Sequence, residues 1–365
     1  MKRHHLLANL CSALCGFALL GTACAPSILQ TGAPAPLAAA GADDGSVASF
    51  YSGKTVRILT GFAPGGGFDT YSRLIARHLG KHIPGNPNVI VENLAGDASA
   101  AAAREVFTHR PKDGTVIASF NENLVLLQAL NGPPSGYDIR RFQFLGTLSD
   151  SPSVCIFRRD TGIESFADLM AGREASVGAN GPGSILHDVP AVLREALGAN
   201  LRIVDDYNGT AQIRLAMERG QLDGGCWTWD SMSVNARGWF EQSPPFVRAL
   251  VALGTQPPDH PWLRETPAAV DFAPNDLARQ VLLGITLPSQ IGKPLAVAPE
   301  VPPARVAALR QALQQTLADP ELQADTQRWA IEIKAKPAAE VEARVRQILD
   351  LSPEAKARLR QALGR

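Results

Sequence analysis

The stretch VRILTGFAPGGGFDTYSRLIARHL, residues 56–79, passes from an apolar run into a helical pattern through a loop rich in glycine. Residues 55–59 are β-branched or apolar for the most part, which predicts a buried strand. The helix that follows begins with unpaired N–H groups and a partial positive charge. Because glycines let a ligand approach the backbone closely, the loop predicts a receptor for a small anion such as a carboxylate or phosphate. A glycine-rich turn without a ligand is the alternative.

Nucleotide-binding loops do not fit this stretch. A phosphate loop needs a lysine after its last glycine, whereas Gly67 and Phe68 follow Gly61 and Gly66 here. The dinucleotide pattern G-x-G-x-x-G is also missing from the loop.

A second loop has the same design. GANGPGSILH, residues 178–187, follows a predicted strand and opens a predicted helix. Asn180, Gly181, Gly183 and Ser184 offer amides, a hydroxyl group and a helix N-terminus. Two such loops, one in each half of the chain, could hold an anion between them. The alternative is that Ser184 only caps its helix.

Strand and helix patterns alternate from residue 55 to about residue 120 and start again near residue 144. This alternation predicts parallel β-α-β units and an α/β protein with two lobes. Residues 303–320 and the segments after them are helical in pattern, which predicts a helical C-terminal tail. The 365 residues carry 35 basic and 35 acidic side chains, so the chain lacks the basic excess typical of nucleic-acid-binding proteins.

The N-terminus has the pattern of an export signal. A basic start is followed by about 15 apolar residues and then by small residues, which predicts a signal peptide over residues 1–24. Cys24 is preceded by Gly-Thr-Ala and resembles a bacterial lipidation site, although ordinary cleavage fits as well. The Ala/Pro-rich residues 25–49 predict a disordered tether. We therefore expect a periplasmic protein that contacts the membrane only through a lipid at Cys24, if it does so at all.

Two cysteines remain beyond the signal segment. Cys155 and Cys226 would be exported to an oxidising compartment, which favours a disulfide between them. Two separate buried thiols are the alternative.

Four segments resemble the substrate-binding receptors of tripartite tricarboxylate transporters, the Bug family. They are GKTVRILTGFAPGGGFDTYSRLIARHLGKHIPGNP, RPKDGTVIASFN, VGANGPGSILHD and GKPLAVAPEVPPARVAALRQALQQTLADPEL. The resemblance covers the chain from about residue 50 to its end. It implies a type II Venus-flytrap fold with mostly parallel sheets, with lobe 1 formed by residues 50–150 and 245–365 and lobe 2 by residues 151–244. It also implies capture of a small organic carboxylate for two integral membrane subunits, without a cofactor, by a protein that we expect to be a monomer.

The resemblance also implies binding residues. Their positions are Phe62, Ala63, Pro64, Gly65, Gly66, Gly67, Asn180, Gly181, Gly183, Ser184, Tyr207, Asn208, Gly209, Trp229 and Asp230.

Polar residues near two other strand ends bear on the ligand. Asn121, Glu122 and Asn123 follow the predicted third strand and are further candidates for the cleft. Asp97 stands where the family has a glycine-rich turn. An acidic side chain in the cleft would repel an anion or accept a ligand amine, which argues against a plain di- or tricarboxylate.

Other functions have weaker support. His78 and His82 are spaced as a helical metal pair, but no further ligand lies near them in sequence, and we predict no metal site. No catalytic motif is present, so we expect no enzyme; a secreted serine hydrolase using Ser184 is a remote alternative. A receptor for a signalling partner, without transport, is the closer one.

Overall fold

The computed structural model describes residues 44–254 and 260–364. The expected signal segment, the expected lipidation site at Cys24 and residues 25–43 of the expected tether lie outside the described residues. No helix within the described ranges is long and apolar enough to cross a membrane.

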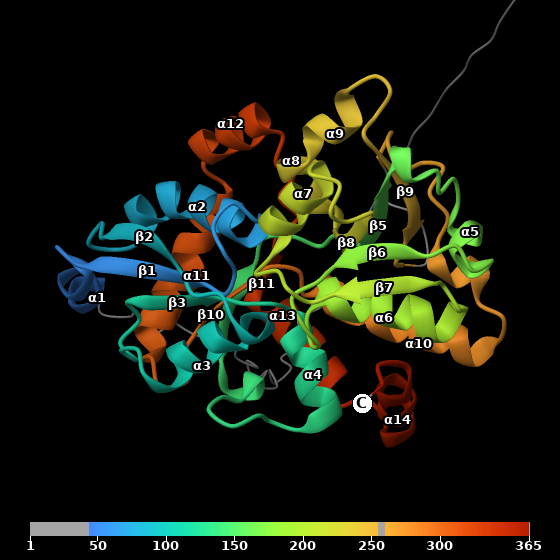
Figure 1. Ribbon diagram of the computed structural model, residues 1–365. Helices are drawn as coiled ribbons and strands as arrows, with labels where there is room; N and C mark the ends of the chain where they lie inside the picture. The colour runs from blue at the N-terminus through green and yellow to red at the C-terminus, as the bar shows by residue number, and fades with distance from the viewer. Residues whose placement is uncertain (1–43, 255–259, 365) are drawn as a thin grey trace, which may run out of the picture. The chain divides into compact units, whose positions relative to one another are not determined.

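Among the described residues the first sheet contains six strands. In spatial order they are β11 (Lys336–Pro337), β4 (Gln143–Thr147), β10 (Pro294–Val297), β3 (Val116–Ser119), β1 (Thr55–Thr60) and β2 (Asn88–Asn93). Figure 1 labels β1, β2, β3, β10 and β11 of this sheet. β1 pairs in parallel with both β2 and β3, as the β-α-β pattern predicted. β10 pairs antiparallel with β3 and β4, and β11 pairs antiparallel with β4.

In the part of the chain that the structure describes, the second sheet contains five strands. Their order is β7 (Leu201–Val204), β6 (Ala175–Gly178), β8 (Gly224–Thr228), β5 (Ser153–Arg158) and β9 (Val247–Ala252). β6 is parallel to β7 and β8, whereas β5 is antiparallel to β8 and β9.

Helices pack on both sheets. They are α1 (Asp44–Tyr51), α2 (Gly67–Leu79), α3 (Ala100–Thr108), α4 (Asn123–Asn131), α5 (Phe166–Met170), α6 (Ile185–Leu197), α7 (Thr210–Glu218), α8 (Trp229–Asn235), α9 (Arg237–Glu241), α10 (Asp276–Thr286), α11 (Pro303–Leu317), α12 (Pro320–Trp329), α13 (Ala338–Leu349) and α14 (Pro353–Ala362). In α2, Tyr71, Leu74, Ile75 and Leu79 are all buried, so their helical spacing does produce an apolar face.

The α/β fold class is confirmed, but three expectations differ from the structure. The sheets are mixed rather than mostly parallel, because the returning strands β9, β10 and β11 run antiparallel to their neighbours. β9 belongs to the second sheet, although residues from 245 onward were assigned to the lobe of the first. Residues 44–49, assigned to the tether, belong to α1, where Val47 and Tyr51 are buried and the Tyr51 hydroxyl donates to the Gly114 carbonyl.

Candidate ligand-binding site

A small cavity lies where strand ends of the two sheets meet. Its lining comes from segments that follow β1, β3 and β6, from the start of α7 and from β8 and the start of α8, and consists of Phe62, Ala63, Gly66, Gly67, Phe68, Asn121, Glu122, Ser184, Ile185, Leu186, Gly209, Thr210, Trp227, Thr228 and Ser231. Ligands of open α/β sheets bind at the carboxyl ends of parallel strands, so this is the place expected for a site. The cavity volume is about 30 Å³, little more than one water molecule needs.

The first glycine loop offers backbone donors to this cavity. α2 begins at Gly67, with Gly66 in extended conformation before it and no side chain of the described residues capping the helix. The first turn of a helix has N–H groups without intrahelical partners, so Gly66 and Gly67 lie at a positive, uncapped end that faces the cavity. Gly65 is different: its φ is +82°, and its N–H donates to Asp69 Oδ2 at 2.9 Å.

Asp69 holds this loop in shape. Burial alone would raise the pKa of Asp69, but hydrogen bonds from Arg73, the Gly65 N–H and Asn93 outweigh it and lower the pKa below its usual value. Asn93 Nδ2 also donates to the Phe62 carbonyl at 2.9 Å. An ionised Asp69 therefore holds the loop in place by accepting from Gly65 and from Asn93.

Two N–H groups of the second glycine loop already donate to carboxylates of the protein. The N–H groups of Gly181 and Gly183 donate to Asp205 Oδ1 at 2.9 Å and to Asp188 Oδ1 at 3.0 Å. Ser184 Oγ accepts from the Leu186 N–H at 3.3 Å, which is the helix-cap role considered from the sequence. The two loops therefore meet at one cavity. In this conformation the first loop has an uncapped helix end there, whereas two N–H groups of the second loop are already bonded.

A polar contact ties the second loop to the first sheet. Asn123 Nδ2, at the start of α4, donates to the Gly183 carbonyl at 3.1 Å and to Asp188 Oδ2 at 2.8 Å. This contact joins the segment after β3 to the segment after β6, and it would have to break if the loops separated.

A buried cation lies behind the cavity. Lys293 and Asp230 are only 2% and 4% exposed, and Lys293 Nζ donates to Asp230 Oδ2. Burial acts to raise the pKa of Asp230, but the Lys293 charge and hydrogen bond outweigh it and lower the pKa. The Lys293 ammonium also lies 4.8 Å from the Tyr71 ring centroid and 5.3 Å from that of Phe68.

Several residues implied by the resemblance lie outside the cavity lining. Eight of the residues expected at the site line it: Phe62, Ala63, Gly66, Gly67, Asn121, Glu122, Ser184 and Gly209. The remainder do not, namely Pro64, Gly65, Asn123, Asn180, Gly181, Gly183, Tyr207, Asn208, Trp229 and Asp230.

Trp227, within β8, and Trp229, the first residue of α8, have different surroundings. Trp227 lines the cavity, whereas Trp229 packs against Phe240, His260 and Trp262. Positions 227 and 229 would share a face within one strand, but the strand ends at Thr228 and Trp229 begins α8, so the two side chains point to different places.

Sequence reasoning missed other lining residues. Phe68, Ile185, Leu186, Thr210, Thr228 and Ser231 were not named as candidates. Phe68, Ile185, Thr210 and Ser231 directly follow or closely follow predicted loop residues, so a wider window around each loop would have found them.

Asp97, His78 and His82 have partners away from the cavity. Asp97 forms an exposed ion pair with Arg104 at 3.3 Å rather than entering the cavity lining. His78 and His82 each contact a separate carboxylate on or beside α12, and no group of three metal-binding side chains occurs in the described part of the chain.

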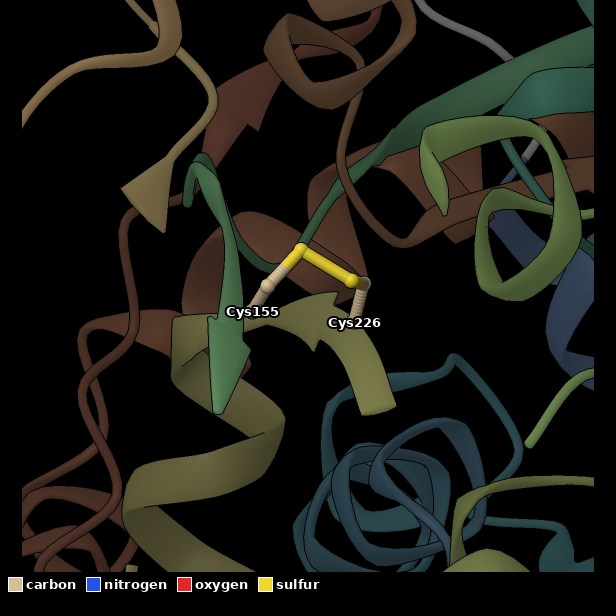
Figure 2. Close-up of a disulfide and its surroundings, with 2 residues drawn as sticks. All are labelled: Cys155 and Cys226. Atoms are coloured by element: carbon tan, nitrogen blue, oxygen red, sulfur yellow. A yellow bond between two sulfur atoms is a disulfide. The ribbon is translucent and has the colours of Figure 1, made fainter. Parts of the chain in front are cut away.

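The two cysteines considered as a pair are bonded in the structure (Figure 2). Cys155 on β5 and Cys226 on β8 are directly opposite each other in the antiparallel register, and both are fully buried. The disulfide therefore links neighbouring strands of the second sheet and closes a segment of 71 residues.

Comparisons with known proteins agree with this architecture. No family model matches the sequence. The structure of the periplasmic binding protein BugD superposes with a TM-score of 0.68 at 21% identity, over 86% of this chain and 98% of that one. MatC from Rhodopseudomonas palustris, with bound malate, gives a TM-score of 0.65 at 20% identity, over 85% and 99%. The chain has the fold of the periplasmic solute-binding proteins. A TctC solute-binding protein from Polaromonas is a further neighbour, at 18% identity over 85% and 99% of the chains with a TM-score of 0.54, so the fold that the resemblance implied is confirmed.

Two curated relatives are UPF0065 proteins. One, from Agrobacterium vitis, is 26% identical over 181 residues, which are 48% of this chain. The other, from Pseudomonas sp. (strain P51), is 25% identical over 307 residues, which are 76% of this chain. The chain spans about half the length of the first relative, 51%, and 85% of the second.

Proposed function

We propose that this chain is an extracytoplasmic receptor that captures a small carboxylate-bearing molecule in the cavity between the two sheets. The observation that carries the proposal is the uncapped N-terminus of α2, whose Gly66 and Gly67 line that cavity. Free backbone N–H groups and a helix dipole favour a carboxylate without requiring a basic side chain in contact with it. The fold supports the same reading, because neighbours of this fold include one with malate and one with adipate.

Binding requires the loops to separate and close again. A cavity of about 30 Å³ is too small for a dicarboxylate, so the loops would have to move apart to admit one. In the mechanism we propose, the carboxylate first meets the N–H groups of Gly66 and Gly67. Residues of the second sheet's loops, among them Ser184 and Ile185, contact it only on closure. A ligand that touches both sides favours the closed state by its difference in affinity for the two states.

Transport is the proposed purpose of capture. The closed receptor would present its ligand to two integral membrane subunits of the tripartite tricarboxylate type, as a monomer in the periplasm. Neighbours of this fold include a periplasmic binding protein and a TctC solute-binding protein, which supports this location and role. The export signal over residues 1–24 and lipidation at Cys24 belong to the same proposal and rest on the sequence pattern.

Two alternatives make different demands. A receptor for a signalling partner would bind the same ligand but would not restore uptake to cells that carry the membrane subunits. A serine hydrolase would need a base at Ser184. Within the described residues Ser184 Oγ accepts from the Leu186 N–H, while His187 Nδ1 contacts Asp188 Oδ1 at 3.1 Å, so neither side chain activates the other.

The test is calorimetric titration of the purified chain with malate, adipate, citrate and benzoate, each beside its uncharged amide. We expect at least one acid to bind and its amide not to bind. Gly66→Asp should abolish that binding while keeping the fold, because the new carboxylate would itself cap α2 from an extended position that any residue can adopt. Gly66→Ala is the matched control, since it adds the same Cβ without the carboxylate. Full affinity in Gly66→Asp would remove the first loop from the site.

A further inference from the structure

Glu122 is a buried acid in the proposed ligand cavity. It follows β3 directly, stands at the start of α4 and lines the cavity beside Asn121. Only 2% of the residue is exposed, and its Oε2 atom has no hydrogen-bond partner among the described residues. An unpartnered buried oxygen is costly, so this atom is a candidate for contact with a ligand.

The charges around Glu122 come from other elements. Lys293, which precedes β10, favours its ionised form, and Asp230 of α8 opposes it. Asp188 of α6 reaches the neighbouring Asn123 at 2.8 Å. Burial dominates these effects and raises the pKa of Glu122 to about 8. At neutral pH the side chain is therefore a carboxylic acid whose O–H needs an acceptor.

The Lys293 ammonium is already paired with a carboxylate of the protein. Lys293 donates to Asp230, so Asp230 is not a free negative charge that could hold a ligand amine. Both charges act on Glu122, but Lys293 acts on it more strongly than Asp230 does, so an ammonium group placed beside Glu122 would meet a net repulsion. A carboxylate oxygen has the opposite preference, because it can accept from the acid and is attracted by the lysine.

We propose that Glu122 selects the ligand as a neutral acid, donating its O–H to a carboxylate oxygen of a molecule that carries no amino group beside that carboxylate. This inference rests on the proposed function, since it assigns a ligand class to the same cavity. It also removes the objection that an acid in the cleft must repel an anion: only the ionised form of Glu122 would do so.

The test uses three probes with the same four-carbon skeleton: succinate, malate and aspartate, which carry hydrogen, hydroxyl and ammonium at one carbon. Titration calorimetry with the wild-type chain at pH 7 should show succinate or malate binding at least about tenfold more tightly than aspartate. Between pH 7 and pH 9 the affinity for the preferred acid should fall by about tenfold, as Glu122 loses its proton. Tighter binding of aspartate would overturn the proposal.

Glu122→Gln separates donation from charge. Glutamine keeps a donor and cannot ionise, so this variant should bind the preferred acid within about threefold of the wild type at pH 7 and lose little affinity by pH 9. Glu122→Met, without a donor, should bind at least about tenfold more weakly than Glu122→Gln. Glu332→Gln changes an exposed acid and should leave both affinity and pH profile unaltered. Equal binding by the glutamine and methionine variants would overturn the donor role.

A ligand-free measurement distinguishes the failure of this inference from the failure of the proposed function. If none of the four-carbon acids binds, the wider panel and Gly66→Asp still decide whether the chain is a carboxylate receptor. The side-chain carboxyl carbon of Glu122, assigned by ¹³C NMR from its loss in Glu122→Gln, should still report a protonated acid at pH 7. An ionised carboxylate at that pH would overturn the inference whatever the ligand.

Discussion

Replacing Lys293 by methionine should lower the free energy of unfolding by about 3–5 kcal/mol, the cost of leaving one partner of a buried ion pair alone. Lys293 and Asp230 are 2% and 4% exposed, so water cannot take the place of the missing ammonium. Methionine fills much of the volume of the lysine stem, which makes the lost charge, rather than a cavity, the main change.

The expected shift of the melting temperature follows from the size of the fold. An unfolding entropy of about 2.1 cal/mol/K per residue, over roughly 300 ordered residues, gives about 0.6 kcal/mol/K. A loss of about 3–5 kcal/mol then lowers the melting temperature by roughly 5–8 °C.

The pH dependence identifies the cause. Without Lys293, burial should raise the pKa of Asp230 above its unfolded value, so that the acid is neutral in the folded variant at low pH. Such a group stabilises the fold below its unfolded pKa and loses that contribution as pH rises through its folded pKa. The deficit of Lys293→Met relative to wild type should therefore be smaller at pH 5 than at pH 8, measured by urea denaturation.

Two further variants complete the experiment. Adding Asp230→Leu to Lys293→Met removes the isolated charge and should recover most of the lost stability. Lys334→Met removes a cation from a pair with Glu332 whose side chains are 57% and 60% exposed, and should change stability by less than about 0.5 kcal/mol. A loss below about 1 kcal/mol in Lys293→Met, or no recovery in the double variant, would refute the reasoning.

Three other outcomes follow from the structure. Replacing Cys155 and Cys226 together by alanine should cost about 4 kcal/mol of unfolding free energy in urea, from the 71-residue segment that they close, and an unchanged midpoint would contradict this. Gly67→Ala should push α2 and α8 apart and enlarge the radius of gyration in X-ray scattering, because the added Cβ would lie 1.9 Å from Ser231 Oγ. Adding Ser231→Gly should reverse this increase. Equal radii of gyration in all three proteins would argue against the clash. The free energy of unfolding should fall as pH rises from 5 to 8, because Glu122 binds a proton more tightly when folded, and Glu122→Gln should flatten that slope; parallel pH profiles would show that Glu122 does not titrate there.

The strand and helix assignments that the sequence predicted well depend on local patterns. β1 and α2 each bury a face whose spacing is visible within a dozen residues, and the loop between them is marked by its glycines. The helix α6 forms around Pro190 because its apolar residues keep their spacing on both sides. These features require no knowledge of what the segment packs against.

Pairing between distant strands could not be predicted in the same way. β9 reads as an apolar strand in either lobe, and only its pairing with β5 places it in the second sheet. Parallel and antiparallel neighbours present similar alternation along the chain, so the mixed character of the sheets is also invisible locally. The boundary expected at residue 245 therefore did not anticipate that β9 pairs with β5.

A glycine-rich motif does not predict whether its N–H groups are free, as the second loop shows. The glycines of residues 178–187 predict accessible amides, yet two of these amides are satisfied by Asp188, five residues beyond Gly183, and by Asp205, 24 residues beyond Gly181. Asp188 lies in the first turn of α6, close to the loop in sequence, and could have been anticipated as an acceptor. Asp205 depends on how β7 aligns with β6, which the sequence does not specify.

This asymmetry gives the two sides of the cavity different tasks in the proposed receptor. The first loop has an uncapped helix end, while the second loop contributes Ile185 and Leu186, and β8 contributes Trp227, to the same cavity. A carboxylate desolvated against apolar side chains gains more from each N–H donor than it would in water. The apolar side should therefore strengthen binding by excluding water rather than by adding donors. Leu186→Ser would then weaken capture of the preferred acid by at least about tenfold in calorimetry, although no hydrogen bond to the ligand is removed. An unchanged affinity would mean that the second loop binds through its backbone after all, with its amides released from Asp188 and Asp205 on opening.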